Sequence, residues 1–282
     1  MIVNALNGVV YGSLLFVLAS GLVLVYGLRR VVNFAHGAFY MLGAYIGYSV
    51  AVRSGFIPGV IAAGVALAMV GVLLDLVAFR KLSDRDPLVT VLVTFGVLLI
   101  LEDLVRTVWG TGNYAIDPPV ALSGVVDIAG APFPIYRLFI VLASALMAGG
   151  MVVWLRYSRS GLWVRAASHS PSVAAMCGVR TNVLGPLVVG LGAAFAGIAG
   201  IIAAPFLSLN PSMGSEILVL SFVVSVIGGL GSFGGAFVSA MILGQVQAFG
   251  IVYLPEMAAL LPFLLMALVL VARPQGIFGQ KV

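Results

Sequence analysis

The chain has 282 residues, of which 62% are hydrophobic and 8% charged, and its formal net charge is +5. Soluble proteins carry about 25% charged residues, so this composition, with a mean hydropathy of +1.20, excludes a soluble globular domain and predicts a protein embedded in a bilayer. The basic residues stand at the ends of apolar segments and form no stripe with stacking aromatic residues, which argues against nucleic-acid binding. The single cysteine excludes an internal disulfide framework.

A membrane-spanning helix needs about 20 mostly apolar residues, and such windows recur along the whole chain. They predict an all-α polytopic membrane protein that forms one transmembrane domain over residues 1–282, with eight or nine spanning helices. The first window follows a start without positive charge and is too long for a signal-peptide core, so we expect it to remain as an uncleaved span. The windows in chain order are 8–28, 31–52, 57–79, 88–109, 136–155, 182–204, 216–231, 233–253 and 257–272.

Two polar or glycine-rich segments interrupt the apolar pattern, RRVVNFAHG at 29–37 and GGLGSFGG at 228–235. Backbone that leaves helical geometry at membrane depth must be shielded by protein or line a watery cavity, and broken helices are common in transport paths. Both segments therefore predict broken or re-entrant helices. For the second segment an ordinary tight turn remains the alternative, because glycines suit turns as well as close helix packing. Its glycines are Gly228, Gly229, Gly231, Gly234 and Gly235.

Strict alternation of the windows divides the basic residues unevenly between the two sides of the membrane. If 156–180 faces the cytoplasm, 11 of the 14 Lys and Arg residues fall on that side, which is the bias expected of cytoplasmic loops. This places the N-terminus outside and the C-terminus inside, with the Lys- and Arg-free connection near 110–135 outside. The cytoplasmic set is Arg29, Arg30, Arg80, Lys81, Arg85, Arg156, Arg159, Arg165, Arg180, Arg273 and Lys281.

Motifs of the common enzyme classes are missing from the sequence. GLGSFG at 229–234 matches a dinucleotide-binding pattern in letters, but it joins two apolar runs and not a strand and a helix. Walker A, GxSxG and HExxH motifs are absent, so we expect no ATP-hydrolysing site, no enzyme activity and no metal site in this chain. Acidic residues near the span ends serve either an ion relay or interfacial anchoring, and their neighbouring loops and arginines favour anchoring. They are Asp75, Glu102, Asp103, Glu216 and Glu256.

The cytoplasmic segment SRSGLWVRAASHSPSVAAMCGVR at 158–180 contains arginines and no acid. Ser170 and Pro171 are typical of the start of a helix and Gly178 of the position after its end, which predicts a short helix over 171–177. A helix this short cannot span a membrane. It either docks in a groove of another protein, with Arg159, Arg165 and Arg180 framing the contact and binding acids of the partner or lipid phosphates, or belongs to an anchored cytoplasmic loop that has no partner.

Three segments carry a resemblance to a known family. In the cytoplasmic segment, Arg165-Ala166, Ala174-Ala175 and Gly178-Val179 resemble the coupling loop of ABC-importer permeases. GLVLVYGLRRVVNFAHGAFYMLGAY at 21–45, and VIGGLGSFGGAFVSAMILG at 226–244 with the tail RPQGIFG, resemble the branched-chain amino acid ABC transporter permease family and, within it, the H-type subunits.

The resemblance implies an ABC-importer permease of the bacterial inner membrane that works by alternating access. Its implied partners are a second, similar permease subunit, two cytoplasmic ATPases that use ATP and Mg, and an external solute-binding protein, while this chain needs no cofactor. The implied coupling residues are Arg159, Arg165, Ala166, Ala174, Ala175 and Gly178. The residues expected to line or gate the path are Asn33, His36, Gly37, Tyr40 and Tyr45.

Alternatives remain at the level of the sequence. Asn33 and His36 have a purely structural interpretation, in which they satisfy backbone groups at the helix break. Similar permeases carry urea, short amides or other amino acids, so the solute stays open. A secondary transporter or channel that works without partners is the alternative from another functional class, and a membrane enzyme is disfavoured because the titratable residues show no motif spacing.

Overall fold

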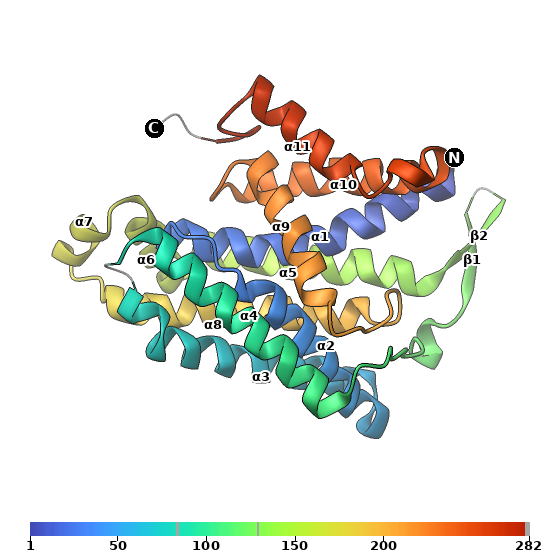
Figure 1. The fold of residues 1–282 in the computed structure, drawn as a ribbon, viewed down its shortest axis with the longest axis horizontal. Helices are drawn as coiled ribbons and strands as arrows, with labels where there is room; N and C mark the ends of the chain where they lie inside the picture. Colours follow the sequence, from blue (N-terminus) through green and yellow to red (C-terminus); the bar gives the residue numbers. More distant parts are fainter. Residues whose placement is uncertain (83–84, 129, 280–282) are drawn as a thin grey trace.

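The computed structural model describes residues 1–82, 85–128 and 130–279 (Figure 1). Lys281, which is expected on the cytoplasmic side, lies outside these ranges. The α-helices are α1 (Ile2–Arg29), α2 (Ala35–Ser54), α3 (Phe56–Val77), α4 (Pro87–Trp109), α5 (Ile135–Tyr157), α6 (Arg159–His169), α7 (Pro171–Met176), α8 (Thr181–Ala203), α9 (Met213–Gly228), α10 (Phe233–Tyr253) and α11 (Leu261–Ala272). Short 3-10 helices are η1 (Phe79–Leu82), η2 (Val120–Leu122) and η3 (Pro255–Met257), and the strands are β1 (Val125–Ile128) and β2 (Ala131–Pro134).

Each of the nine apolar windows contains a helix, which confirms the all-α polytopic class. In the described part of the chain, six helices are long and apolar enough to cross a membrane, namely α1, α3, α4, α5, α8 and α10. The helix α2 has 20 residues, whereas α9 and α11 have 16 and 12. Two of the nine windows are therefore filled by helices too short to cross about 30 Å of hydrocarbon alone.

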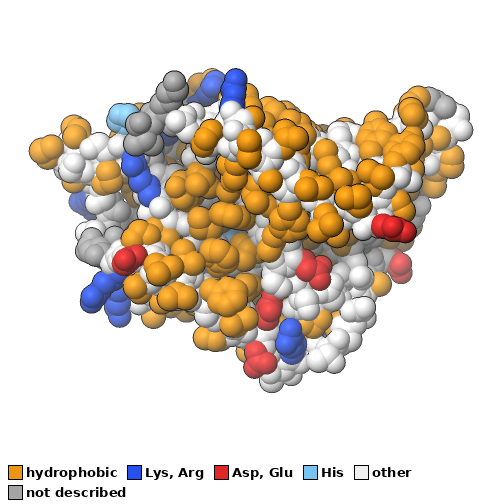
Figure 2. Space-filling view, turned by 45° about the horizontal axis from the view of Figure 1, so that its top comes forward, with side chains coloured by type: hydrophobic (Ala, Val, Ile, Leu, Met, Phe, Trp, Pro, Cys, Tyr) orange, Lys and Arg blue, Asp and Glu red, His pale blue; other side chains and the backbone are white. Residues whose placement is uncertain are grey.

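The helix α1 lies at the centre of the bundle and its neighbours surround it. In its most apolar stretch 89% of the residues are buried, against 67% for α8 and only 28%, 22% and 17% for α3, α4 and α5. The peripheral helices expose rows of Leu, Ile and Val, as a surface in contact with lipid requires. Hydrophobic side chains accordingly cover the middle of the molecule in Figure 2.

Glycines let the central helices pack backbone against backbone. A Cβ added to Gly43 of α2 would lie 2.2 Å from the Cα of Gly197 in α8, and one added to Gly200 would lie 2.1 Å from the carbonyl oxygen of Tyr40. On the other side of α1, a Cβ at Gly244 of α10 would lie 2.3 Å from the carbonyl oxygen of Gly8. Small residues permit this close approach in membranes, where van der Waals contact contributes most of the helix association.

The two ends of the bundle differ in charge. The helices α6 and α7 and the C-terminal segment lie at one end, and the N-terminus with the β1–β2 hairpin lies at the other (Figure 1). Lys and Arg side chains gather at the α7 end in Figure 2, while most of the visible Asp and Glu side chains lie elsewhere. Of the described basic residues, only Arg53, Arg106 and Arg137 belong to helix ends at the side opposite α7.

The connection between α4 and α5 contains an antiparallel hairpin that the sequence analysis did not predict. Its strands pair Val125 with Pro134, and the Oδ1 of Asp127 accepts a hydrogen bond of 2.7 Å from the backbone N–H of Gly130 in the turn. The same connection is fastened to the α8–α9 loop, because Tyr114 and Leu209 exchange two backbone hydrogen bonds of 3.0 and 2.8 Å.

Candidate translocation site

The helix α2 begins near the middle of the bundle and not at its end. The Nε2 of His36, in the first turn of α2, lies 2.8 Å from the carbonyl oxygen of Leu18 in α1. Leu18 precedes Arg29, the last residue of α1, by 11 residues, which correspond to about 16 Å of helix. Residues 30–34 therefore run back along α1 from the α7 end to mid-depth. The first predicted break is a re-entrant segment at membrane depth.

Polar side chains satisfy the backbone at this break. The Oδ1 of Asn33 accepts a hydrogen bond of 3.1 Å from the N–H of Ala35, and the N–H of Phe34 donates to the Oγ1 of Thr94 in α4 at 3.2 Å. Asn33 and His36 are 4% and 1% exposed. In this conformation both side chains form hydrogen bonds with backbone groups, in agreement with the purely structural interpretation of Asn33 and His36.

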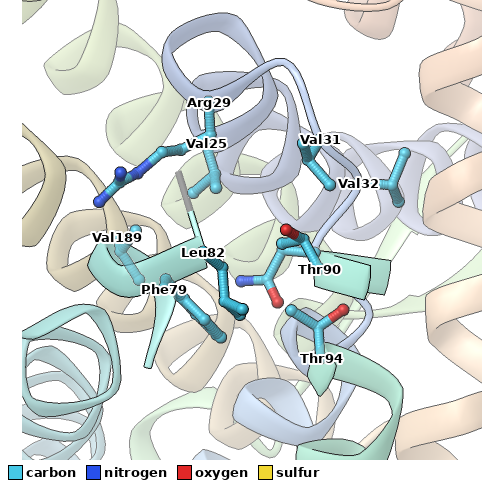
Figure 3. Close-up of a pocket in the computed structure, with 10 residues that line it drawn as sticks. Val25, Arg29, Val31, Val32, Phe79, Leu82, Thr90, Thr94 and Val189 are labelled. Carbon is cyan, nitrogen blue, oxygen red and sulfur yellow. The ribbon is translucent and has the colours of Figure 1, made fainter. Parts of the chain in front are cut away.

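A small cavity of about 40 Å³ adjoins the break at the α7 side. Figure 3 shows the side chains of Thr90 and Thr94 on one side of it and those of Phe79 and Leu82 on another. Asn33 also lines this cavity, and its buried Nδ2 has no hydrogen-bond partner among the described residues. A space of this size holds water and no solute.

The segment GGLGSFGG does not break a helix at membrane depth, and of its two interpretations the ordinary tight turn is confirmed. It forms the turn between α9 and α10 at the α7 end, where Gly231 lies close to Tyr26. A Cβ at Gly235 would lie 1.9 Å from the carbonyl oxygen of Gly228, so these two glycines permit close packing. Gly229 and Gly231 have positive φ values of 97° and 86° and serve the turn. Gly234 has open space around it and contributes no helix packing within the described chain.

A second break at depth lies instead between α8 and α9, at 204–212. A Cβ at Gly37 in α2 would lie 2.1 Å from the carbonyl oxygen of Gly214 in the first turn of α9. The N-termini of α2 and α9 therefore cross each other at mid-depth. This break was not predicted, because nothing in the composition of 204–212 reveals that the chain turns back into the bundle.

The helix α4 provides hydrogen-bond acceptors to the N-termini of both α2 and α9. Besides the bond from Phe34 to Thr94, the Oε1 of Glu102 in α4 accepts a hydrogen bond of 3.2 Å from the N–H of Ser215 in the first turn of α9. Glu102 is 7% exposed, so its assignment to interfacial anchoring was wrong. A carboxylate stabilises the positive end of a helix. The two acceptors are eight residues apart, about 12 Å along α4.

A larger cavity of about 280 Å³ opens beside the crossing, between α1, α2, α9 and the α8–α9 loop. Of the predicted path residues, Tyr40 lines it. Gly37 lies in the helix crossing, and Tyr45 is buried against Trp109 and Tyr114, with ring centroids 5.5 and 6.0 Å away. The lining residues are Tyr11, Tyr40, Leu207, Ser208, Asn210, Met213, Glu216, Ile217 and Leu220.

Two further acids occupy positions that fit an anchoring role, and a third forms an internal ion pair. Asp103 and Glu256 are exposed towards the end of the bundle opposite α7. Asp75 is fully buried and forms an ion pair with Arg29, which joins the ends of α3 and α1. Gly185 in α8 leaves room for this pair, since a Cβ there would lie 2.3 Å from the guanidinium of Arg29.

The predicted coupling segment forms α6 and α7 at the tip of the molecule (Figure 1). Arg159, Arg165 and Ala166 of α6 are exposed, as are Ala175 and Gly178. Gly178 has a φ of 84°, as expected after a helix end.

Two details of this segment differ from expectation. Ala174 is buried, with 4% exposure, so it packs inside the segment and does not share an outer face with Ala175. The side chain of Ser170 lies 3.3 Å from the Oγ of Ser172 and does not cap α7. The outer face of the segment exposes Trp163, Val173 and Met176.

Comparison with known proteins places this architecture in a family. The family described as "Branched-chain amino acid transport system / permease component" matches residues 4–270. The chain is 29% identical to the high-affinity branched-chain amino acid transport system permease protein LivH of Escherichia coli (strain K12), over 97% of this chain and 94% of that protein. It is 28% identical to the corresponding permease protein BraD of Pseudomonas aeruginosa, with the same coverage.

Among solved structures, PsaBC from Streptococcus pneumoniae in complex with Fab aligns with 96% of this chain and 92% of that chain at 11% identity. Its TM-score is 0.49. The family match covers nearly the whole bundle, including both helix breaks and the exposed α6–α7 tip. The chain therefore belongs to the branched-chain amino acid transport system permease family.

Proposed function

We propose that this chain is the permease subunit of an ABC importer that moves branched-chain amino acids across a bacterial inner membrane by alternating access. The observation that carries the proposal is the family match over residues 4–270. It is supported by relatives that align with 97% of this chain and whose names state this transport role. The helix starts at mid-depth support it, because discontinuous helices at the midplane are typical of transport paths.

In this proposal the α7 end faces the cytoplasm, which agrees with the concentration of Lys and Arg there. Two ATPases, which use ATP and Mg, bind at α6 and α7, and a second permease subunit completes the path. A solute-binding protein docks at the end that carries the β1–β2 hairpin. The side chains of Val173 and Met176 in α7 are apolar and exposed, and Arg159, Arg165 and Arg180 are exposed in the same 158–180 segment. An exposed apolar helix face suits insertion into a groove of a partner protein.

The test uses the tagged full-length chain, purified with its partners and reconstituted in vesicles. Met176 is 79% exposed at the tip of α7, so Met176→Asp changes no internal packing of the described chain. We expect this variant to lose copurification with the ATPases and ATP-driven leucine uptake. The matched control is Met257→Asp, at an exposed methionine of η3 at the opposite end, which should retain both.

Ala174→Trp is a poorer test of docking, because a buried alanine cannot be enlarged without disturbing the segment itself. Uptake that continues without ATP and collapses with the proton gradient would reject the ABC-importer assignment in favour of a secondary transporter.

A further inference from the structure

Glu216 occupies an unusual position for a charged residue. It lies in the first turn of α9, two residues after Gly214, whose carbonyl oxygen contacts α2 at mid-depth. Its side chain is exposed on the isolated chain, on the same face of α9 as Ser212 and Val219. A charged group at this depth is costly in contact with lipid and faces protein or a watery cavity. The exposed face of α9 is therefore directed towards the path and away from lipid.

Glu216 also lacks the partner that would explain it as a structural residue. Among the described residues it forms no salt bridge, in contrast to Asp75, and its carboxylate caps no helix, in contrast to Glu102. The N-terminus of α9 is already served by Glu102 and by the Oδ1 of Asn210, which accepts from the N–H of Ser212 at 2.9 Å. Its negative charge remains available for a ligand.

The cavity around Glu216 combines one charge with neutral donors and an apolar wall. Its volume of about 280 Å³ lies near the lower limit of about 300 Å³ for small-molecule sites, so it suits a small solute. The apolar wall is made by Leu207, Met213, Ile217 and Leu220, and the polar wall by Tyr11, Tyr40, Ser208 and Asn210. Glu216 is the one charged residue among the nine that line it.

This set of groups matches one class of solute. A positively charged amino group would meet Glu216, a short aliphatic side chain would contact Ile217 and Leu220, and a carboxylate would accept hydrogen bonds from tyrosine hydroxyls such as that of Tyr40. We propose that this cavity is a transit site in which Glu216 receives the α-ammonium group of a small aliphatic amino acid on its way through the permease. The inference rests on the proposed function and deepens it, because it assigns solute recognition to the permease itself.

The test compares Glu216→Gln, Glu216→Asp and the native chain in the reconstituted complex, with radiolabelled leucine supplied by the solute-binding protein. Loss of a charged hydrogen bond should lower leucine uptake by about tenfold in Glu216→Gln. ATP hydrolysis stimulated by the loaded binding protein should stay at the native rate, since the coupling segment is untouched. Glu216→Asp keeps the charge and should retain an intermediate rate of uptake. Glu256→Gln makes the same chemical change at an exposed glutamate outside the cavity and should behave as native.

Two results would overturn the assignment of Glu216. Uptake by Glu216→Gln equal to that of Glu256→Gln would show that the carboxylate does not contact the solute. Loss of copurification with the partner subunits in both Glu216 variants would show that the cavity is an assembly surface. Absence of ATP-driven leucine uptake in the native complex would instead reject the proposed function, and it would be seen before any substitution is compared.

Discussion

The crossing of α2 and α9 is the contact on which both helix breaks depend, and Gly37→Ala tests it directly. The added methyl carbon would lie 2.1 Å from the carbonyl oxygen of Gly214 and 2.7 Å from the Cβ of Leu218. Ordinary carbon–oxygen contacts are about 3.3–3.6 Å. The obstacle is backbone and cannot rotate away, so α2 and α9 would have to separate by about 1 Å.

The size of the effect follows from two opposing contributions. Overpacking in a tight core costs about 1–3 kcal/mol, while replacing glycine by alanine within a helix contributes about 0.5–1 kcal/mol of stability. Gly96→Ala in α4 isolates the second contribution, because no atom lies within 4 Å of the added carbon there. The difference between the two variants is then the overpacking cost alone, about 1–3 kcal/mol.

The assay is thermal unfolding of the purified chain in detergent, with all variants heated at one rate because the midpoint of an irreversible transition depends on the heating rate. At about 2–4 °C per kcal/mol for chains of about 250 residues, we expect the midpoint of Gly37→Ala to lie several degrees below that of Gly96→Ala, and Gly96→Ala to match or exceed the native chain. Equal midpoints for the two variants would refute the backbone contact between Gly37 and Gly214.

Two further predictions concern the acceptor on α4 and the orientation of the bundle. Glu102→Leu leaves an N–H of α9 unpaired at depth and should cost about 1–3 kcal/mol, whereas Glu102→Gln keeps an acceptor oxygen and should cost less; equal unfolding midpoints would contradict the bond. Cys177, the one cysteine of the chain, is exposed beside α7 and should react with a membrane-impermeant maleimide in inside-out vesicles but not in intact spheroplasts. Val120→Cys in a Cys177→Ser background, at the opposite end with 93% exposure, should show the reverse, and the same sidedness for both cysteines would reject the topology.

The helices that depend on nearby residues alone could be predicted from the sequence. Nine apolar windows correspond to nine helices because each helix must satisfy its own backbone in hydrocarbon. The helix expected over 171–177 is Pro171–Met176, since proline at its start and glycine after its end act within a few residues. The class, the family and the exposed short helix could therefore be predicted from the sequence.

The depth of each helix start could not be predicted in the same way. The window at 216–231 resembles any other apolar run, yet the helix begins at Met213 within the bundle, because Gly214 fits against Gly37 of a helix that lies far away in the sequence. Glycine serves turns and close packing alike, so GGLGSFGG gave no means of choosing between them. Glu102 and Glu216 resembled anchoring acids because their distance from the membrane surface depends on this tertiary contact.

The positions of Thr94 and Glu102 restrict how the bundle can change shape. Their helix α4 is loosely embedded, with 22% of its most apolar stretch buried, whereas α2 is fixed to α8 through Gly43 and Gly200. If α4 moves away, the N–H groups at both breaks lose their acceptors at membrane depth, where unpaired backbone groups are costly. The two bonds must therefore break and be replaced together. A transition between outward- and inward-open states that displaces α4 has to supply new acceptors for both helix starts, from water in an opened path or from the solute itself.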